Sequence, residues 1–326
     1  MIMEEILIAT LKDVAQQANV SKMTVSRVIN QPELVTKELK ELVFKAMKEL
    51  NYRPNTAAKA LARNRTMVVK VLILEEMDIT EPYYMNLLNG IAQELDQYQY
   101  ALQLMTENSV DLGNCDGYII TGMRKTDYEW LEQLDKPIIL FGENRRGIPY
   151  VDSDNKDGSS RATQHAIDCG YEQIVFVGID VEESFEYSRE SGYLEVIAGY
   201  PEKTPEIHRL SNSSSLAEKL VKDALPLQPN TCFVCASDRL AIGVERGLQA
   251  LNHTIPAEYG IIGFDGVFLD QIASPKLTTM KQDIVGMGRA CVTQLMQLID
   301  GKPLTNQELL FDTELITRGT TKERIH

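Results

Sequence analysis

Several familiar classes of protein are excluded by what this sequence of 326 residues lacks. Its five cysteines are odd in number and widely scattered, so they form no disulfide framework, which indicates a reducing environment. No apolar run approaches the roughly 20 residues that span a bilayer. The opening segment MIMEEILIAT carries two acidic residues and no basic region, unlike a secretory signal peptide. We therefore expect a cytoplasmic protein with no membrane segment.

Signatures of metal binding and catalysis are also missing. The four histidines lie far apart, and none is paired with cysteines at a zinc spacing. There is no Walker loop, no G-x-G-x-x-G after a strand and no G-x-S-x-G turn. The C-x-x-C spacing of CFVC at 232–235 lies within an alternating apolar strand, where buried thiols are more common than redox or metal ligands. We therefore expect that the protein is not an enzyme and that it binds no cofactor and no metal ion.

An ordinary globular composition accompanies an uneven distribution of charge. Hydrophobic residues make up 44% of the chain and charged residues 25%, and the length suffices for two or three domains. The net charge is −14, yet residues 1–66 carry 11 Lys and Arg against 7 Asp and Glu, which leaves 22 basic and 40 acidic residues for the remainder. A basic head on an acidic body is typical of a nucleic-acid-binding module joined to another domain, although a solvated surface would give the same counts.

The apolar pattern of residues 10–50 predicts three short helices. Thr10 is an N-cap candidate for the first, and the inner stripe of that helix comprises Leu11, Val14, Ala15 and Ala18. Ser21 caps the second helix, whose inward residues are Val25, Val28 and Ile29 and whose outward residues are Lys22, Met23, Ser26, Arg27 and Asn30. The third helix starts near Thr36, with an expected inner face of Leu39, Leu42, Val43, Ala46, Met47 and Leu50.

Two short helices joined by a tight turn and followed by a third form a helix-turn-helix unit. The major groove accepts one helix, and the N-terminal part of that helix contacts base edges. This placement predicts base contacts for Lys22, Met23 and Arg27. Phosphate contacts, which position the helix without specifying sequence, are expected from Ser21, Thr24, Ser26 and Asn30. Periodicity alone fits equally well a three-helix bundle whose polar face is only solvated.

The segment LNYRPNTAAKALARN (50–64) predicts a further helix of roughly eight residues after a proline, which is marginally stable by itself. Such a helix is expected to fold only against a partner, here its copy in a dimer and the DNA. Leu61 would then be an apolar wedge for a minor-groove base step. Lys59, Arg63 and Arg65 would lie near phosphates.

The stretch TLKDVAQQANVSKMTVSRVIN, followed by ELNYRPNTAAKALA, resembles the DNA-binding head and hinge of the lactose-repressor (LacI) family of bacterial transcription regulators. The resemblance runs from Thr10 to Leu61 and implies that Tyr52 and Asn55 contact the DNA backbone and that Leu61 kinks the operator. The full set of residues expected to contact DNA is Thr10, Leu11, Ser21, Lys22, Met23, Thr24, Ser26, Arg27, Asn30, Thr36, Tyr52, Asn55, Lys59 and Leu61.

After Thr66 short apolar strands alternate with amphipathic helices, which predicts parallel sheets covered by helices on both faces. The predicted strands are MVVKVLIL, YALQLM, GYIIT, PIILFG, IVFVGI, EIHRL, TCFVCAS and YGIIGFDG. About ten strands over some 250 residues are too many for one doubly wound unit. We therefore expect two α/β subdomains with a cleft between them.

Motifs in this body, among them CDGYII, SRESGY, ASDRLAIGVERGL and IIGFDG, occur in the order of the family's periplasmic-binding-protein-like effector domain. The resemblance implies two doubly wound parallel-sheet subdomains joined by three crossovers, which we place near Asp152, Lys281 and Ile316. The expected division is a helix-turn-helix domain (1–53), a hinge helix and linker (54–66), and an effector-binding and dimerisation domain (67–326). Within the last, the N-subdomain covers about 67–152 and 284–316 and the C-subdomain about 153–281 and 317–326.

The resemblance places a small-molecule site in the cleft, at the carboxyl ends of the strands. Arg189 corresponds to an arginine that holds ligand hydroxyls or a carboxylate, and Asp265 to a hydroxyl-binding acid. Ser237 and Asp238 replace the family's usual Asn-Asp pair, so an amide that often donates and accepts hydrogen bonds with a sugar is absent. For Asp238 an N-cap of the following helix is an equally good interpretation.

A second departure from the family pattern is the segment TENSVDLGN (106–114), which has only nine residues where the family has a helix near the dimer face.

Together these observations predict a homodimeric regulator, most simply a repressor of a carbohydrate or related operon, whose partners are double-stranded operator DNA and a small-molecule effector such as a sugar. The alternative is a regulator of the same fold controlled by a protein co-regulator, as in the catabolite control proteins, with a reduced effector site.

Overall fold

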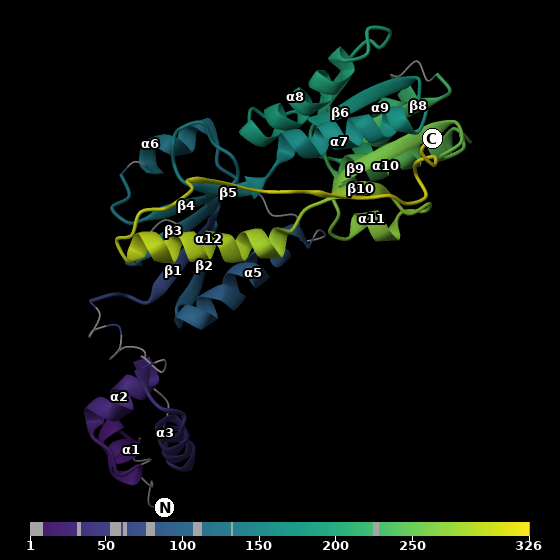
Figure 1. The fold of residues 1–326 in the computed structure, drawn as a ribbon. Helices are drawn as coiled ribbons and strands as arrows, with labels where there is room; N and C mark the ends of the chain where they lie inside the picture. The colour runs from purple at the N-terminus through teal and green to yellow at the C-terminus, as the bar shows by residue number, and fades with distance from the viewer. Residues whose placement is uncertain are drawn as a thin grey trace, which may run out of the picture. The chain divides into compact units, whose positions relative to one another are not determined.

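The computed structural model describes residues 9–30, 34–52, 60, 64–75, 82–106, 113–131, 133–223 and 228–325. The chain divides into two compact units, residues 1–66 and residues 67–326. The first unit is helical in its described part. The second unit is built from two parallel sheets with helices packed against them (Figure 1).

The first unit contains helices α1 (Leu11–Gln17), α2 (Lys22–Asn30) and α3 (Lys37–Glu49). Each follows a residue with a hydroxyl side chain, namely Thr10, Ser21 and Thr36. The backbone N–H of Thr10 and its hydroxyl both donate to Oδ2 of Asp13, at 2.8 and 2.7 Å. The Oγ of Ser21 accepts from the backbone N–H of Thr24 at 3.0 Å, so the capping predicted for Thr10 and Ser21 is confirmed.

The core of this unit joins all three helices, and its fully buried members are Val14, Ala15, Ala18, Val25, Val28, Val43 and Ala46. The prediction that Leu42 belongs to the inner face is wrong, because its side chain is 52% exposed. Leu42 lies at the margin of the apolar stripe centred on Val43 and Ala46, where its side chain stays half-exposed.

The second unit has two six-stranded sheets with the orders β11-β5-β4-β3-β1-β2 and β12-β10-β9-β8-β6-β7. The strands of the first sheet are β1 (Val68–Ile73), β2 (Ala101–Thr106), β3 (Gly117–Thr121), β4 (Ile138–Phe141), β5 (Tyr150–Ser153) and β11 (Glu308–Phe311). Those of the second are β6 (Gln173–Ile179), β7 (Glu206–Leu210), β8 (Thr231–Cys235), β9 (Tyr259–Asp265), β10 (Thr278–Lys281) and β12 (Glu314–Ile316). All pairs are parallel except β10 with β12, so the expected fold class is confirmed.

Helices α5 (Tyr83–Tyr98) and α12 (Ile284–Ile299) lie side by side against the first sheet (Figure 1). A Cβ at Gly90 would lie 2.2 Å from the backbone oxygen of Val285, so only glycine permits this approach of the two helices. The short elements η2 (Lys125–Asp127) and α6 (Tyr128–Leu131) follow β3. Against the second sheet, α7 (Asn155–Asp168) packs on α8 (Ser184–Ala198), and α9 (Ser214–Asp223) packs on α10 (Asp238–Ala250), with α11 (Leu269–Ile272) preceding β10.

The chain passes between the two sheets after β5, after β10 and between β11 and β12. The predicted third crossover near Ile316 is misplaced, because Ile316 pairs with Thr279 and Glu314 pairs with Lys281 in the second sheet. The crossover is the two-residue gap between Phe311 and Glu314. Both flanking strands are short edge strands whose side chains are half-exposed, and their apolar runs LLF and LI are shorter than the roughly four to eight residues that indicate a strand. The interior of the segment 106–114 lies outside the described residues.

Candidate functional site

Helix α2 presents a polar face to solvent while its other face is fully buried. Val25 and Val28 are 0% exposed, whereas Met23 is 71% exposed. Lys22 and Arg27 are exposed beside Met23, so the three predicted base-contacting side chains share the outer surface of one helix. The hydroxyls of Ser21 and Thr24 lie 2.8 Å apart at the start of that surface. This is the arrangement that insertion of one helix into a major groove requires.

Other predicted DNA contacts take part in the structure of the head itself. Leu11 and Tyr52 pack against its core, and burial raises the pKa of the Tyr52 phenol. The Oγ1 of Thr36 accepts from the backbone N–H of Leu39 at 3.4 Å, which caps α3. Ser26 is half-buried on α2. Asn55, Lys59 and Leu61 lie outside the described residues, as does the side chain of Asn30.

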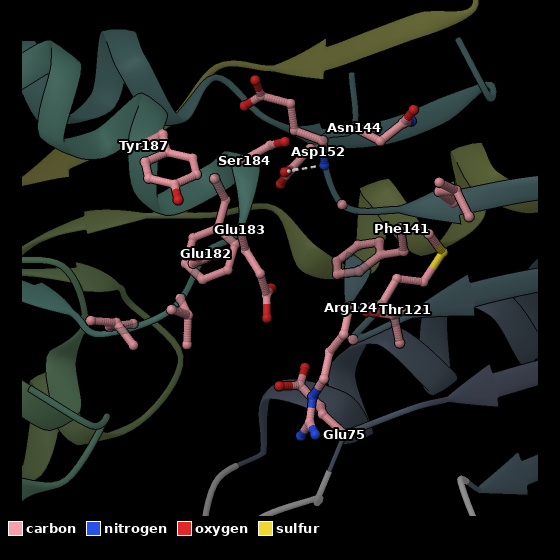
Figure 2. A pocket seen from close by; sticks show the side chains of 18 of the residues that line it. Glu75, Thr121, Arg124, Phe141, Asn144, Asp152, Glu182, Glu183, Ser184 and Tyr187 are labelled. Atoms are coloured by element: carbon pink, nitrogen blue, oxygen red, sulfur yellow. Dashed lines mark hydrogen bonds between the residues drawn. The ribbon is translucent and has the colours of Figure 1, made fainter. Parts of the chain in front are cut away.

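The second unit contains a cavity of about 840 Å³ that is lined by residues of both sheets (Figure 2). Its lining residues follow the carboxyl ends of β1, β3 and β4 in one sheet and of β6, β8 and β9 in the other. Parallel strands expose their last residues at one edge of a sheet, which is where ligands bind in open α/β folds. Arg189, Ser237 and Asp265, which the family resemblance assigned to the effector cleft, line this cavity.

Arg189 is held rigidly in the cavity lining. Its Nε donates to Oδ1 of Asn155 at 2.9 Å, and Nη1 donates to the backbone oxygen of Ala236 at 2.5 Å. The guanidinium lies 3.8 Å from the ring centroid of Phe264 and 5.1 Å from that of Phe185. Two hydrogen bonds and two aromatic faces fix the plane of the guanidinium, so its outer edge can donate to a ligand at little entropic cost.

Asp152, at the end of β5, faces the same part of the cavity from the other subdomain. Its carboxylate accepts from the backbone N–H groups of Glu143 at 2.8 Å and of Ser153 at 2.7 Å, and from Nδ2 of Asn155 at 3.1 Å. Burial raises the pKa of Asp152, while these hydrogen bonds and the nearby Arg189 act in the opposite direction. From the sequence, Asp152 was identified only as lying near a crossover. Asn155, whose amide hydrogen-bonds both Asp152 and Arg189, was not identified.

Asp265 forms a second connection between the subdomains. Its Oδ1 accepts from Nε2 of Gln282 at 2.8 Å, and Oε1 of Gln282 accepts from the hydroxyl of Ser153 at 2.7 Å. The backbone of Asp265 has φ of +120°, a strained conformation for a residue with a side chain. Strain of this kind is concentrated at functional sites, where surrounding contacts hold a side chain in one position.

The structure places Asp238 neither at the N-cap of α10 nor in the lining of the cavity. Asp238 is 1% exposed and does not line the cavity, because its carboxylate accepts from the backbone N–H of Gly266 at 2.9 Å and from the hydroxyl of Thr279 at 2.6 Å. The N-cap of α10 is Ser237, whose Oγ accepts from the backbone N–H of Leu240 at 3.2 Å and donates to Asn212 at 2.7 Å. Burial and the nearby Asp265 raise the pKa of Asp238.

The other end of the cavity holds residues that the sequence did not indicate. Figure 2 shows Arg124 beside Glu75, with Glu183 directed toward them from the second subdomain. The Tyr84 hydroxyl donates to the Glu75 carboxylate. Burial and the negative charge of Glu75 raise the pKa of Glu183 to about 7, against the effect of Arg124. Only tertiary structure brings these residues together, since β1, β3 and α8 lie far apart in the sequence.

Within the described ranges, no cluster of three or more His, Cys, Asp and Glu side chains is arranged to hold a metal ion. The helices of those same ranges are all too short or too polar to cross a membrane.

Comparisons with known proteins assign the family. Residues 10–55 match the bacterial regulatory proteins of the lacI family, and residues 163–321 match the periplasmic binding protein-like domain. The chain is 52% identical to the uncharacterized HTH-type transcriptional regulator YvdE of Bacillus subtilis (strain 168), over 96% of this chain and 99% of that protein. It is 30% identical to the ribose operon repressor of Halalkalibacterium halodurans, over 96% of this chain and 97% of that protein.

Solved structures agree in fold over nearly the full length of the chain. The lac repressor dimer bound to operator and the anti-inducer ONPF has a TM-score of 0.74 at 23% identity, over 97% of this chain and 100% of that chain. A complex of the transcriptional regulator CelR with cellobiose has a TM-score of 0.72 at 24% identity, over 96% and 99% of the two chains. The helix-turn-helix head, the two-sheet body and the extent of the match to YvdE together establish that the chain is a DNA-binding transcriptional regulator and belongs to the lacI family.

Proposed function

We propose that this regulator is a cytoplasmic homodimeric repressor that places α2 of each copy in the major groove of a pseudo-palindromic operator. The observation that carries the proposal is the outer face of α2, where Lys22, Met23 and Arg27 stand exposed above a fully buried Val25 and Val28. A planar guanidinium at Arg27 suits bidentate contact with guanine, and Lys22 suits a guanine or a phosphate oxygen. Two copies related by a twofold axis would contact two half-sites about one helical turn apart.

The cavity in the second unit is the proposed site of a small polyhydroxylated effector. Arg189, Asp152 and Asp265 offer donors and acceptors from both subdomains at one point of its lining. The CelR structure contains cellobiose, a ligand of the same chemical character. Ser237 lacks the amide that would hydrogen-bond a sugar at this position. The amide of Asn212, whose oxygen accepts from the Ser237 hydroxyl, lines the cavity beside it.

The proposed coupling uses the two hydrogen-bonded connections across the subdomains. Asp152–Asn155–Arg189 and Ser153–Gln282–Asp265 both join the end of β5 to residues of the cavity lining. A ligand that contacts Arg189 and Asp265 favours one relative angle of the subdomains over another. Operator affinity then changes by the difference in ligand affinity between the two states, a coupling typically worth about 1–3 kcal/mol.

The experiment is selection of a binding site from random-sequence DNA, followed by fluorescence anisotropy titrations of that site. A palindromic consensus bound by a dimer of the purified protein supports the proposal. Selection of no consensus, or binding by a monomer, contradicts it. Small-molecule control is tested separately by adding sugars to the complex. If no sugar changes operator affinity, control by a protein partner becomes the better explanation.

A further inference from the structure

The lining of the cavity is elongated along the edge of the first sheet. The sheet order β5-β4-β3-β1 places three strand spacings between Asp152, in β5, and Glu75, which follows β1. Neighbouring strands lie about 4.8 Å apart, so this part of the lining extends roughly 14 Å. A single sugar ring is about as long as one strand spacing. A ligand that contacts both ends therefore has more than one ring.

Aromatic side chains fill the interval between those ends. The ring centroids of Tyr84 and Tyr83 lie 5.6 Å apart, and those of Tyr83 and Phe141 lie 6.3 Å apart, each pair edge to face. All three rings line the cavity. We call them the aromatic row. Tyr83 is the middle ring, because it contacts both Tyr84 and Phe141. The apolar faces of sugar rings pack well on aromatic side chains, so successive rings can lie along this row.

Each end of the aromatic row carries polar groups from both subdomains. At the β5 end, Asp152 faces Arg189 and Asp265. At the β1 end, Glu75 and Arg124 face Glu183 (Figure 2). Carboxylates and guanidinium groups bind vicinal hydroxyls through paired acceptors and donors. The cavity thus repeats the same carbohydrate-binding chemistry at two separated places.

The charge of the lining disfavours an anionic ligand. Among the described lining residues, Asp and Glu outnumber Arg seven to five. The guanidinium of Arg145 lies over the ring of Tyr187 at 5.7 Å, and that of Arg146 lies over the ring of Tyr128 at 4.6 Å. A phosphorylated or carboxylated sugar would bring a further negative charge against this excess of carboxylates. An uncharged ligand avoids that repulsion.

We propose that the cavity binds an uncharged oligosaccharide of at least two sugar rings, which lies along the aromatic row with one end at Asp152, Arg189 and Asp265 and the other at Glu75, Arg124 and Glu183. The inference rests on the proposed function for its consequence at the operator. Ligand binding itself can be measured without DNA, so failure of the two proposals can be distinguished.

The first experiment is isothermal titration calorimetry of the full chain with glucose, with the disaccharides maltose and cellobiose, with maltotriose and cellotriose, and with glucose 6-phosphate. In at least one of the two linkage series, affinity should rise by roughly tenfold or more from glucose to the trisaccharide, which corresponds to one additional hydrogen bond to a charged group. Glucose 6-phosphate should bind no better than glucose. Equal affinity for glucose and the trisaccharides, tighter binding of the phosphate, or binding of none of these sugars would overturn the proposal.

Matched variants then assign the two ends. Glu75→Gln should weaken binding by a factor that grows with chain length, whereas Asp265→Asn should weaken mono-, di- and trisaccharides by similar factors. Glu183→Gln, on the opposite side of the β1 end, should repeat the effect of Glu75→Gln and serves if that variant does not fold. Glu202→Gln, an exposed residue that does not line the cavity, is the control for loss of a carboxylate. If Glu75→Gln and Glu183→Gln both lowered the affinity by a factor that does not depend on the length of the sugar chain, the assignment of the β1 end would be contradicted.

Discussion

Asn155 hydrogen-bonds Arg189 through its amide oxygen, at 2.9 Å, while its amide nitrogen donates to Asp152 at 3.1 Å. Because Asn155 is the first residue of α7 and Asp152 lies in β5, this one amide spans the first crossover between the subdomains. It orients the arginine from the second subdomain and the carboxylate from the first toward the same part of the cavity.

Removing this amide should lower the stability of the second unit. Asn155→Ala leaves Nε of Arg189 and one oxygen of Asp152 without this partner in a buried environment, which should cost about 1–3 kcal/mol in the free energy of unfolding. Urea denaturation measures the loss. The exposed Asn114→Ala is the matched control. Equal stability of the two variants would show that the amide does not support the site.

Arg27→Ala should relax base discrimination at one operator position. A bidentate arginine–guanine contact contributes typically about 1–3 kcal/mol of discrimination against a wrong base. Anisotropy titrations with single-base operator variants measure the effect, and the exposed α3 residue Lys45→Ala is the control for loss of positive charge. An unchanged base preference in Arg27→Ala would count against direct contact between this side chain and the bases.

Leu61→Ala tests the expected minor-groove wedge. Leu61 lies outside the described residues, so the expectation rests on the family resemblance of the hinge segment. The variant should weaken binding to the selected operator, because the kink that the side chain supports is lost. Binding to random DNA, which depends mainly on phosphate contacts, should change little. An equal loss on both kinds of DNA would refute the wedge.

The stability of the second unit should depend on pH through Glu186. This side chain is 1% exposed, and neither carboxylate oxygen has a hydrogen-bond partner of normal geometry among the described residues. Burial raises its pKa to about 7, against the effect of Arg189. The folded state therefore holds a proton that the unfolded state has released between pH about 4.5 and 7, so stability falls as pH rises through this window.

Glu186→Gln should remove that contribution. The variant should be more stable than the parent above pH 7, by up to about 3 kcal/mol, and the difference should vanish toward pH 4.5. Urea unfolding at about pH 5 and about pH 8 gives the comparison. The same pH dependence in parent and variant would mean that Glu186 is not the titrating group.

The sequence predicted those parts of the fold that are marked by local pattern. The helices of the head follow from stripes such as Val14, Ala15 and Ala18, and a central strand such as β8 follows from its apolar run, since these features require only their neighbours in sequence. The strands β11 and β12 escaped prediction because they are short, half-exposed edges.

Only some of the residues that line the cavity were predicted from the sequence, and the reason is a different one. Arg189 and Asp265 were found through motifs, but the aromatic row and the group of Glu75, Arg124 and Glu183 exist only after β1, β3 and α8 are brought together. Asp238, in contrast, was predicted to lie at the cavity or at a helix N-cap, and the structure places its side chain elsewhere. A polar residue beside a strand end can face the protein interior, where Gly266 and Thr279 satisfy it, and no local pattern distinguishes the two orientations.

The most direct test of control by the cavity measures operator release by the parent protein and by Arg189→Ala as the best-binding sugar is titrated into each operator complex. Both proteins should bind the selected operator with similar affinity, because α2 is unaltered, and only the parent should respond to the sugar at low concentration. A variant that responds to the sugar as the parent does would contradict the claim that the cavity controls the head.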